Sequence, residues 1–247
     1  MIAGIIPARY ASTRFPGKPL LDIAGKSMIQ RVYEQAGKSK SLNKLVVATD
    51  DQRVLEHVHS FGGEAVITSA HHPSGTDRCW DALRQLDDAY QYVINIQGDE
   101  PFIDPSQIDT LSSLLQDGTT ELATLMIPIN SPEYLFDTGE VKIVLNERME
   151  ALYFSRMAIP FLKGVDQQEW CKHHDYYRHV GMYAYRTDVL KKITKMPVSS
   201  LERAESLEQL RWLENGYRIK CAITHFESHC IDTLDDLEKV LKIMNIK

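Results

Sequence analysis

Three positively charged side chains lie close together near the N-terminus, in a segment rich in small residues. Arg9, Arg14 and Lys18 fall between an apolar run and Pro19. Small residues let backbone N–H groups converge on an anion, and fixed cations neutralise its charge. Two arginines and a lysine suit a polyphosphate better than a single monoanion. The segment therefore predicts a polyphosphate-binding loop. The alternative is a basic surface loop, and the spacing of a Walker loop is absent.

An acidic residue follows a second apolar run. Residues 92–96 predict a buried strand, and Gln97, Gly98 and Asp99 come directly after it. Parallel α/β sheets bind ligands beyond the carboxyl ends of their strands, and Gly98 permits close approach of the backbone to a ligand. Mg²⁺ takes one or two carboxylates together with phosphate oxygens. We therefore favour a Mg²⁺ ligand at Asp99 over the alternative, an Asx-turn that ends the strand.

A third polar segment, residues 72–78, precedes an expected helix. The hydroxyls of Ser74 and Thr76, together with backbone N–H groups, form a small polar cradle that suits a ligand. The alternative is an ordinary helix start, with Ser74 or Thr76 as the N-cap and Asp77 near the positive end of the helix dipole. The segment alone does not decide between the two.

Alternating strands and helices position these segments. Short apolar runs predict buried strands at residues 2–6, 45–49, 65–68 and 92–96. We expect Pro7 to end the first strand, because it has no N–H for the ladder. We expect Ser27 to cap a helix over residues 28–38 and Asp50 to cap the next helix. Near-continuous apolar strands separated by helices predict a parallel sheet covered on both faces, with the ligand at one edge.

The second half of the chain predicts helices at 105–115, 199–214 and from Leu234, and strands at 121–129, 141–145, 151–154, 177–185 and 218–224. Residues 161–176 predict a mobile excursion. Alternation along 177–185 puts His179, Tyr183 and Tyr185 on one face, which lines a pocket or an interface. For Asp232, which precedes the last helix, the residues alone leave open that it is only the N-cap of that helix.

The composition excludes several classes of protein. A chain of 247 residues suits one large α/β domain, or one with a small appended lobe. A net charge of −6 disfavours nucleic-acid binding. No apolar run approaches the roughly 20 residues that cross a bilayer, and no signal peptide is seen, so we expect a cytoplasmic protein with no membrane partner. The four cysteines lack C-x-x-C spacing, and the histidine pairs lack zinc-site spacing, which indicates reduced thiols and no zinc.

These segments together resemble the 3-deoxy-manno-octulosonate (Kdo) cytidylyltransferases, also called CMP-Kdo synthetases, over nearly the whole chain. The resemblance is carried by residues 5–20, 74–78, 97–101, 151–156, 178–185, 207–211 and 231–233. The first segment alone indicates a sugar nucleotidyltransferase, whereas the ordered set is specific to this family. The chain departs from the family pattern at Cys230 and Leu234, where Gly and Pro are usual.

The resemblance implies an α/β, Rossmann-like nucleotidyltransferase fold, with a mostly parallel central sheet and helices on both faces. It implies a single domain over residues 1–247, with a small β-rich lobe at 140–190 that serves sugar binding and dimerisation. The implied reaction transfers CMP from CTP to the anomeric hydroxyl of Kdo. It gives CMP-Kdo and pyrophosphate, and activates Kdo for lipopolysaccharide synthesis. The implied enzyme is a cytoplasmic homodimer that uses Mg²⁺.

The resemblance also implies roles for individual residues. Catalysis is assigned to Arg9, Arg14, Lys18 and Asp99. The nucleotide site comprises Ala8, Arg9, Arg14, Lys18, Ser74, Gly75, Thr76 and Arg78. The Mg²⁺ ligands are Asp99 and Asp232. The sugar site comprises Gln97, Arg156, His179, Tyr183, Tyr185, Glu208 and Gln209, with Arg156 facing the sugar carboxylate.

The expected chemistry is attack of the sugar 2-hydroxyl on the α-phosphorus of CTP, with pyrophosphate leaving in line. Such a transfer depends on positioning and charge neutralisation. One Mg²⁺ would steady the triphosphate, and a second would lower the pKa of the attacking hydroxyl; we identify no dedicated general base. The alternatives are 8-amino-Kdo or a sialic acid as the sugar, a different base preference, and a nucleotide-binding regulator without catalysis. The row from His179 to Tyr185 could also form a two-fold dimer contact.

Overall fold

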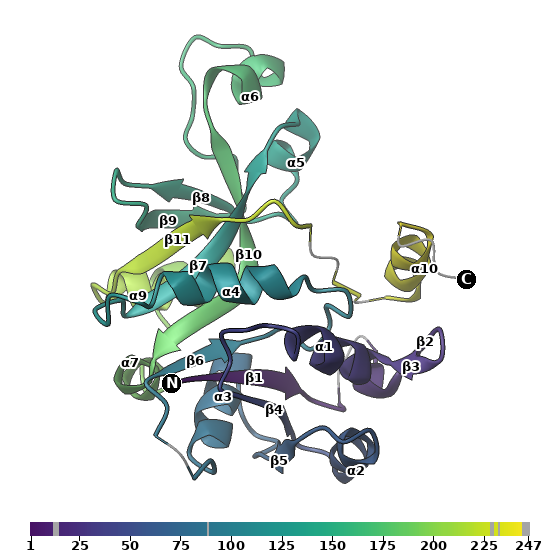
Figure 1. Cartoon of the computed structure of the whole chain (residues 1–247). Coiled ribbons are helices and arrows are strands. Elements are labelled where there is room, and N and C mark those ends of the chain that lie inside the picture. The colour runs from purple at the N-terminus through teal and green to yellow at the C-terminus, as the bar shows by residue number, and fades with distance from the viewer. Residues whose placement is uncertain (12–14, 88, 228–229, 232, 244–247) are drawn as a thin grey trace. The chain divides into compact units, whose positions relative to one another are not determined.

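The computed structural model describes residues 1–11, 15–87, 89–227, 230–231 and 233–243, without the side chains of Leu234 and Ile243. The chain divides into two compact units, each described by itself below. The first unit consists of Met1–Asp109 and Ser228–Lys247, and the second of Thr110–Glu227. The helix α4 (Pro105–Ser113) contains the boundary between them (Figure 1).

The first unit alternates strands with helices, as its sequence predicts. Its strands are β1 (Ile2–Ala8), β2 (Asp22–Ile23), β3 (Lys26–Ser27), β4 (Lys44–Thr49), β5 (Ala65–Ile67) and β6 (Tyr92–Asn95). Its helices are α1 (Met28–Ala36), α2 (Gln52–Ser60), α3 (Gly75–Leu83) and α10 (Leu234–Ile243), with a short 3₁₀ turn, η1, at Lys18–Leu20.

The main strands of this unit form a parallel sheet in the order β6-β1-β4-β5. The chain moves outward from β1 to β4 to β5, then crosses back to β6 on the other side of β1. Right-handed crossovers put α1 and α2 on one face of such a sheet and α3 on the other. The strand order therefore reverses between β1 and β6. Folds of this kind bind ligands at that point, beyond the carboxyl ends of the strands.

Pro7 does not end β1, which is a correction to the sequence prediction. β1 continues to Ala8, and Pro7 stands opposite Ala48 of β4. The amide of Ile96 donates to the Ile5 carbonyl, so the backbone N–H and C=O of Ile5 point toward β6. Pro7, two positions further along the strand, points its backbone in the same direction. Pairing with β6 stops at Ile5, so the missing N–H of Pro7 faces no strand acceptor. The penalty for proline inside a central strand therefore does not arise.

Two helix starts in the first unit follow the sequence prediction, and one does not. The Ser27 hydroxyl accepts from the Gln30 amide at the start of α1, and the Ser74 hydroxyl caps α3. The helix α2 is capped by Asp51, whose carboxylate accepts from the Arg53 amide, and not by Asp50. Asp50 and Asp51 are adjacent candidates for this cap, and the sequence does not show which of them is engaged by a distant partner.

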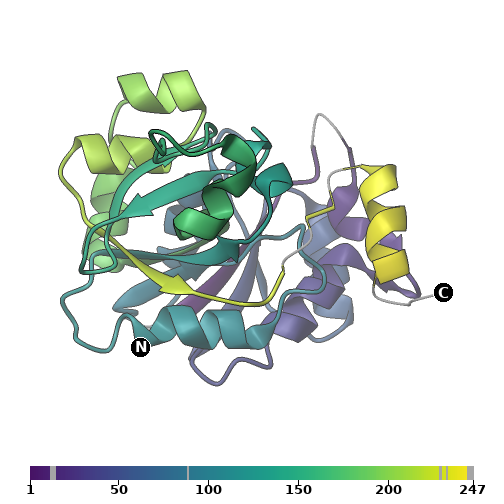
Figure 2. The same ribbon diagram turned by 90° about the horizontal axis from the view of Figure 1, so that it is seen from above.

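The C-terminal helix α10 packs against the N-terminal part of the first unit. Val240 and Ile231 share an apolar cluster with Ile23 and Met28. Both views show α10, in yellow, beside the purple elements α1, β2 and β3 (Figures 1 and 2). Segments from opposite ends of the sequence thus share one core, and residues 230–231 lead into it. The prediction of a helix from Leu234 is confirmed.

The second unit contains five strands. They are β7 (Leu122–Ile129), β8 (Lys142–Leu145), β9 (Ala151–Ser155), β10 (Tyr176–Arg186) and β11 (Ile219–Ile223). β7 lies between β11, to which it is parallel, and β10, to which it is antiparallel. β8 pairs antiparallel with both β10 and β9, so the predicted hairpin of residues 141–154 is confirmed.

β10 contains a bulge that the alternating pattern did not reveal. Val180 pairs with Leu125 and Tyr183 with the next residue, Thr124, so two extra residues are inserted. The Thr124 hydroxyl lies 2.9 Å from the Met182 carbonyl and 3.2 Å from the Val180 carbonyl, which gives these carbonyls a hydrogen-bond donor. Because the insertion is an even number of residues, the side-chain alternation is preserved.

The helices of the second unit are α5 (Pro132–Phe136), α6 (Trp170–His173), α7 (Thr187–Ile193), α8 (Ser200–Glu205) and α9 (Gln209–Glu214), with a 3₁₀ turn, η2, at Gln167–Glu169. The predicted helix at 199–214 is interrupted, because Ser206 adopts φ 55° between α8 and α9. The excursion at 161–176 is ordered by Trp170, which is buried in a cluster with Ile129, Leu135 and Tyr176. The helices α5 and α7 were not predicted.

All four cysteines are free thiols. Among the described residues, no helix combines the length and apolarity that crossing a membrane would require.

Candidate active site

Lys18 and Asp99 form an ion pair at the carboxyl edge of the first unit's sheet. The Lys18 Nζ lies 2.8 Å from Asp99 Oδ2. Lys18 belongs to η1, and Gly17 before it adopts φ 76°, which glycine accommodates without strain. The lysine side chain is 10% exposed and the aspartate side chain 30% exposed. A cation and a partly accessible carboxylate therefore meet where the strand order reverses.

Gly98 lets the backbone carry Asp99 close to the end of β1. A Cβ atom at Gly98 would lie 2.6 Å from the Pro7 carbonyl oxygen, closer than such contacts permit. The Asp99 carbonyl accepts a hydrogen bond from the Ile231 amide at 3.0 Å. The segment that precedes residue 232 is therefore attached directly to the backbone of Asp99. Asp232 itself, like Arg14, lies outside the described residues.

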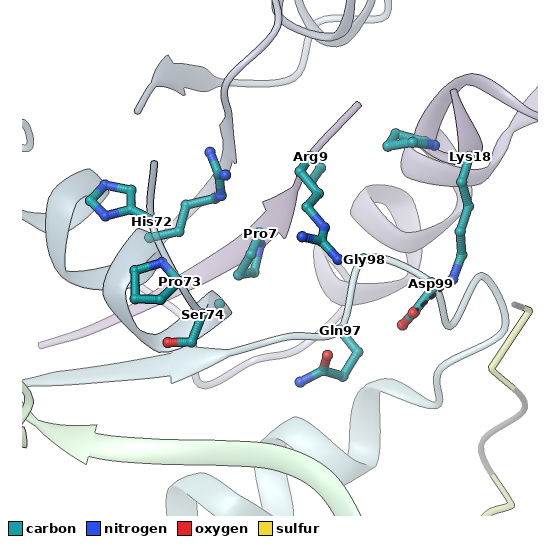
Figure 3. A pocket seen from close by; sticks show the side chains of 13 residues that line it. Pro7, Arg9, Lys18, His72, Pro73, Ser74, Gln97, Gly98 and Asp99 are labelled. Atoms are coloured by element: carbon teal, nitrogen blue, oxygen red, sulfur yellow. Dashed lines mark hydrogen bonds and ion pairs between the residues drawn. The ribbon is translucent and has the colours of Figure 1, made fainter. Parts of the chain in front are cut away.

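A cleft of about 260 Å³ opens at this edge (Figure 3). It is formed by the ends of β1 and β6, the start of α3, and η1. Of the predicted nucleotide and metal residues it gathers Ala8, Arg9, Lys18, Ser74, Gly75, Arg78 and Asp99. Gln97, predicted for the sugar, lines the same cleft, whereas the buried Thr76 does not. Arg9, Lys18 and Arg78 are cations of this lining, and of these Lys18 is paired with Asp99 and Arg78 with Asp50.

The start of α3 forms one wall of the cleft. The Ser74 hydroxyl lies 3.2 Å from the Asp77 amide, from which it accepts, and 2.6 Å from Asp77 Oδ2, to which it donates. Ser74 is therefore an N-cap and a cleft residue at once. The N-cap interpretation is therefore confirmed. The ligand-binding interpretation stays a prediction, which the cleft position of Ser74 and Gly75 at the start of α3 supports.

Arg78 lines the cleft, but its guanidinium is committed to protein partners. Its Nη2 lies 2.9 Å from Asp50 Oδ2, and its Nη1 lies 2.7 Å from the Thr68 hydroxyl. The side chains of Arg78 and Asp50 are 4% and 10% exposed. Asp50, expected to cap α2, thus forms a buried ion pair instead.

His72 and Pro73 also line the cleft, and sequence reasoning missed them. The His72 Nε2 lies 2.7 Å from Asp81 Oδ2. This contact, together with the Ser69 amide, holds the pKa of Asp81 below its usual value against the opposing effect of burial. Their position in the sequence could have indicated them, because both residues immediately precede Ser74.

Three residues predicted for the sugar site share one aromatic cluster in the second unit. The ring of Tyr183 lies 5.1 Å from His179, 6.0 Å from Tyr185 and 5.0 Å from Trp212, between ring centroids. The predicted common face of β10 is therefore confirmed by direct contact. Burial lowers the pKa of His179 to about 3 and raises that of Tyr183 well above its usual value. Both side chains are uncharged at neutral pH.

Arg156, predicted to face the sugar carboxylate, follows β9. Its Nε lies 2.9 Å from the Glu205 carbonyl, and its Nη1 lies 3.2 Å from the Thr138 carbonyl. The Glu205 carboxylate accepts from the Arg156 amide and from the Ser155 hydroxyl. The guanidinium is therefore held in a fixed direction. Glu208 and Gln209 lie together at the start of α9.

The fold and the cleft together define a nucleotide-binding α/β protein. A model of the cytidylyltransferase family matches residues 3–219. A 3-deoxy-manno-octulosonate cytidylyltransferase of Parabacteroides distasonis is 54% identical over 245 residues, which cover 98% of this chain and 97% of that protein. An 8-amino-3,8-dideoxy-manno-octulosonate cytidylyltransferase of Shewanella piezotolerans is 47% identical over 236 residues, covering 94% of each chain.

A solved structure of CMP:2-keto-3-deoxy-manno-octonic acid synthetase complexed with CTP matches with a TM-score of 0.91 at 42% identity, covering 99% of this chain and 98% of that chain. A 4-diphosphocytidyl-2C-methyl-D-erythritol synthase of Anaerococcus prevotii shares the fold alone, with a TM-score of 0.61 at 11% identity, covering 99% and 98%. The chain belongs to the cytidylyltransferase family, and within it to the 3-deoxy-manno-octulosonate cytidylyltransferases. The predicted family and the predicted α/β nucleotidyltransferase fold are confirmed.

Proposed function

We propose that this protein transfers CMP from CTP to the anomeric hydroxyl of Kdo, releasing pyrophosphate and activating Kdo for lipopolysaccharide synthesis. The observation that carries the proposal is the cleft in the first unit, where Lys18 meets Asp99 at 2.8 Å between the ends of β1 and β6. A polyphosphate needs cations, a metal needs a carboxylate, and this cleft supplies both at the position where such folds bind nucleotides.

The triphosphate is held by Arg9, Arg14 and Lys18 in this proposal. Lys18 is bonded to Asp99 in the structure, and we propose that it exchanges this carboxylate for a phosphate oxygen when CTP enters. In that position its ammonium stabilises the negative charge that develops on the departing pyrophosphate. The nucleoside lies against the start of α3, near Ser74 and Gly75. Positioning of the reacting groups and electrostatic stabilisation together account for almost all of the catalysis in such transfers.

Mg²⁺ suits the residues present at the cleft. Asp99 presents a partly exposed carboxylate that already attracts a cation, and carboxylate oxygens are ligands that Mg²⁺ prefers. The attachment of Ile231 to the Asp99 backbone supports Asp232 as the second ligand. When bound, Mg²⁺ would neutralise triphosphate charge and polarise the reacting phosphoryl group.

Kdo is recognised in this proposal by Gln97 and by residues of the second unit. Arg156 carries a charge that its carbonyl partners do not neutralise, so it remains available to pair with the sugar carboxylate. The uncharged, partly exposed ring of His179 can contact the sugar, whereas Tyr183 and Tyr185 are 7% and 0% exposed and contribute by packing in the aromatic cluster with that ring. Glu208 and Gln209 complete the set of hydroxyl partners.

The protein acts as a cytoplasmic homodimer in this proposal. Free thiols at all four cysteines suit a reducing compartment. Large apolar side chains in or next to the lobe at 140–190 are exposed, among them Leu152, Met157 and Phe161. Surfaces of this kind mark contacts between proteins.

The function is tested by pyrophosphate release from CTP with Mg²⁺ and a panel of acidic sugars. We expect release to depend on Kdo and to be much slower with UTP. A clear preference for 8-amino-Kdo would move the assignment to the activity named for the Shewanella piezotolerans relative. Tight CTP binding without pyrophosphate release from any sugar would instead indicate a nucleotide-binding regulator.

A further inference from the structure

The carboxylate of Asp50 joins two segments that form different walls of the cleft. Its Oδ1 accepts from the Tyr10 amide at 3.2 Å, and its Oδ2 accepts from Arg78 Nη2 at 2.9 Å. Tyr10 immediately follows the cleft residue Arg9, and Arg78 belongs to α3. One buried side chain therefore uses both of its oxygens to hold both walls.

The backbone of Tyr10 connects the two ends of the loop that carries Arg9 and Lys18. Its carbonyl accepts from the Gly17 amide at 2.9 Å, and Lys18 follows Gly17. The Tyr10 amide and carbonyl thus connect Asp50, on one side, with the residue that precedes Lys18, on the other. Displacing Tyr10 would displace both Arg9 and Lys18 from the cleft.

The guanidinium of Arg78 is likewise held by more than one hydrogen bond. Its second nitrogen, Nη1, donates to the Thr68 hydroxyl at 2.7 Å, and that hydroxyl lies 3.1 Å from the Thr49 carbonyl at the end of β4. With its side chain only 4% exposed, the guanidinium depends on Asp50 for charge compensation. The position of α3 relative to β4 is therefore set by the same carboxylate that holds Tyr10.

We propose that Asp50 is a positioning residue that sets the distance between the nucleoside wall and the triphosphate wall of the cleft. The proposal rests on the proposed CTP site. An aspartate suits this task because both oxygens of a carboxylate accept hydrogen bonds. Each oxygen of Asp50 has its own partner, so replacing one of them with the NH₂ group of asparagine would set a donor against either the Tyr10 amide or the Arg78 guanidinium.

The proposal predicts a loss specific to the β- and γ-phosphates. CMP carries the base, the ribose and one phosphate, whereas CTP also engages the cationic loop. A shifted loop should therefore weaken CTP binding while leaving CMP binding nearly intact. A general loss of folded protein would weaken both nucleotides equally, so the ratio of the two dissociation constants separates positioning from stability.

The test is isothermal titration of wild type and Asp50→Asn with CTP and with CMP, in Mg²⁺ and without sugar. We expect the ratio of the CMP to the CTP dissociation constant to fall about tenfold in Asp50→Asn, the value of one hydrogen bond to a charged group. Where Asp50→Asn shows no cooperative melt, Asp50→Glu takes its place. Glutamate keeps Arg78 paired but shifts the oxygen that Tyr10 needs, and a fall in the same ratio is expected.

Asp109→Asn is the matched control. Asp109 accepts with Oδ1 alone, from Ser39, Lys40 and Ser41, at the opposite end of β4 from Asp50. Asparagine keeps that oxygen, so the ratio should stay as in wild type. A folded Asp50 variant that also keeps the wild-type ratio overturns the positioning role. A wild-type protein that binds CTP no tighter than CMP would instead remove the proposed triphosphate site itself.

Discussion

Lys18 and Asp99 compensate each other's charge in the cleft, which explains how two ionised groups persist at a partly buried site. The contact occupies one of the three ammonium donors of Lys18 and one of the two carboxylate oxygens of Asp99. In the proposed reaction, CTP would supply an anion for Lys18 and Mg²⁺ a cation for Asp99, so the pair could separate without leaving an unpaired charge. On this proposal, the ammonium of Lys18 lies where Mg²⁺ would bind Asp99, and the Asp99 carboxylate lies where a phosphate would bind Lys18.

Asp99→Asn should reduce turnover by roughly 10³-fold, because the amide loses the charge that attracts Mg²⁺. Pyrophosphate release over a range of Mg²⁺ concentrations measures this effect, and Asp232→Ala should weaken the Mg²⁺ dependence severely. Asp22→Asn is the control, because Asp22 is exposed and its Oδ1 accepts from Gly25, which asparagine also permits. Normal Mg²⁺ kinetics in both Asp99 and Asp232 variants would remove the metal assignment.

Arg156→Ala should chiefly impair use of the sugar. Loss of one charged hydrogen-bonding partner corresponds to a rise of roughly 10- to 100-fold in the KM for Kdo, with the KM for CTP nearly unchanged. Steady-state kinetics with each substrate varied in turn measures the two constants. Arg148→Ala is the control, because Arg148 is an exposed arginine of the same unit, in the turn between β8 and β9. An unchanged KM for Kdo in Arg156→Ala would discard the carboxylate role.

Among the structural elements, β10 shows how much the sequence could reveal. Its two-residue alternation correctly grouped His179, Tyr183 and Tyr185, because an even insertion preserves alternation. The bulge itself was hidden, since it depends on the Thr124 hydroxyl of another strand. The same limit explains Asp50, whose partners Tyr10 and Arg78 lie 40 and 28 residues away. Local patterns predict strands and caps, whereas the distant partners that select among them appear only in three dimensions.

The structure of residues 161–176, which the sequence predicts as a mobile excursion, was missed for a similar reason. Its sequence is polar and irregular, so it lacks the periodicity that indicates an element. Trp170 nevertheless buries its ring beside Tyr176, with 6.2 Å between the stacked ring centroids. Leu162, Val165 and Cys171 pack against the same cluster, so contacts with residues outside the segment, rather than its own periodicity, give it a defined structure.

The burial of His179 on β10 should make the protein less stable as the pH falls. Because the folded-state pKa is about 3, the unfolded state binds the extra proton between about pH 6.5 and pH 3. This contribution is fully present above about pH 6.5 and is lost as the pH falls through that window, by up to about 1.4 kcal/mol per pH unit.

Urea unfolding of wild type and His179→Phe between pH 4.5 and 7 measures this loss. The free energy of unfolding should fall more steeply with decreasing pH in wild type than in the variant. His59→Gln is the control, since His59 is exposed on α2, and its slope should match that of wild type. Parallel slopes for wild type and His179→Phe would show that His179 titrates alike in both states.

The whole molecule carries a net charge of −6, yet its proposed substrate is an anion. Attraction must therefore be local to the cleft, where Arg9 and Lys18 gather. At physiological ionic strength, charges beyond about 8 Å are largely screened, so the distant acidic surface opposes binding only weakly. An acidic protein with one cationic cleft can select a small anion and still avoid nucleic acids.

The homodimer is tested by light scattering coupled to size-exclusion chromatography. We expect twice the mass of the chain for wild type and a shift toward the monomer in Phe161→Asp, because a charge would then be buried in the contact. Val198→Asp is the control, since Val198 is an exposed apolar residue outside the lobe at 140–190. A wild-type protein that remains monomeric at micromolar concentration would contradict the dimer.

A crystal structure with CTP and Mg²⁺ tests the central claim most directly, because that claim assigns the nucleotide to the cleft between β1 and β6. The account predicts phosphate oxygens at Lys18 and Arg9, the nucleoside at the start of α3, and Mg²⁺ on Asp99 in place of Lys18. A nucleotide bound away from this cleft, or bound there with Lys18 still paired to Asp99, would contradict it.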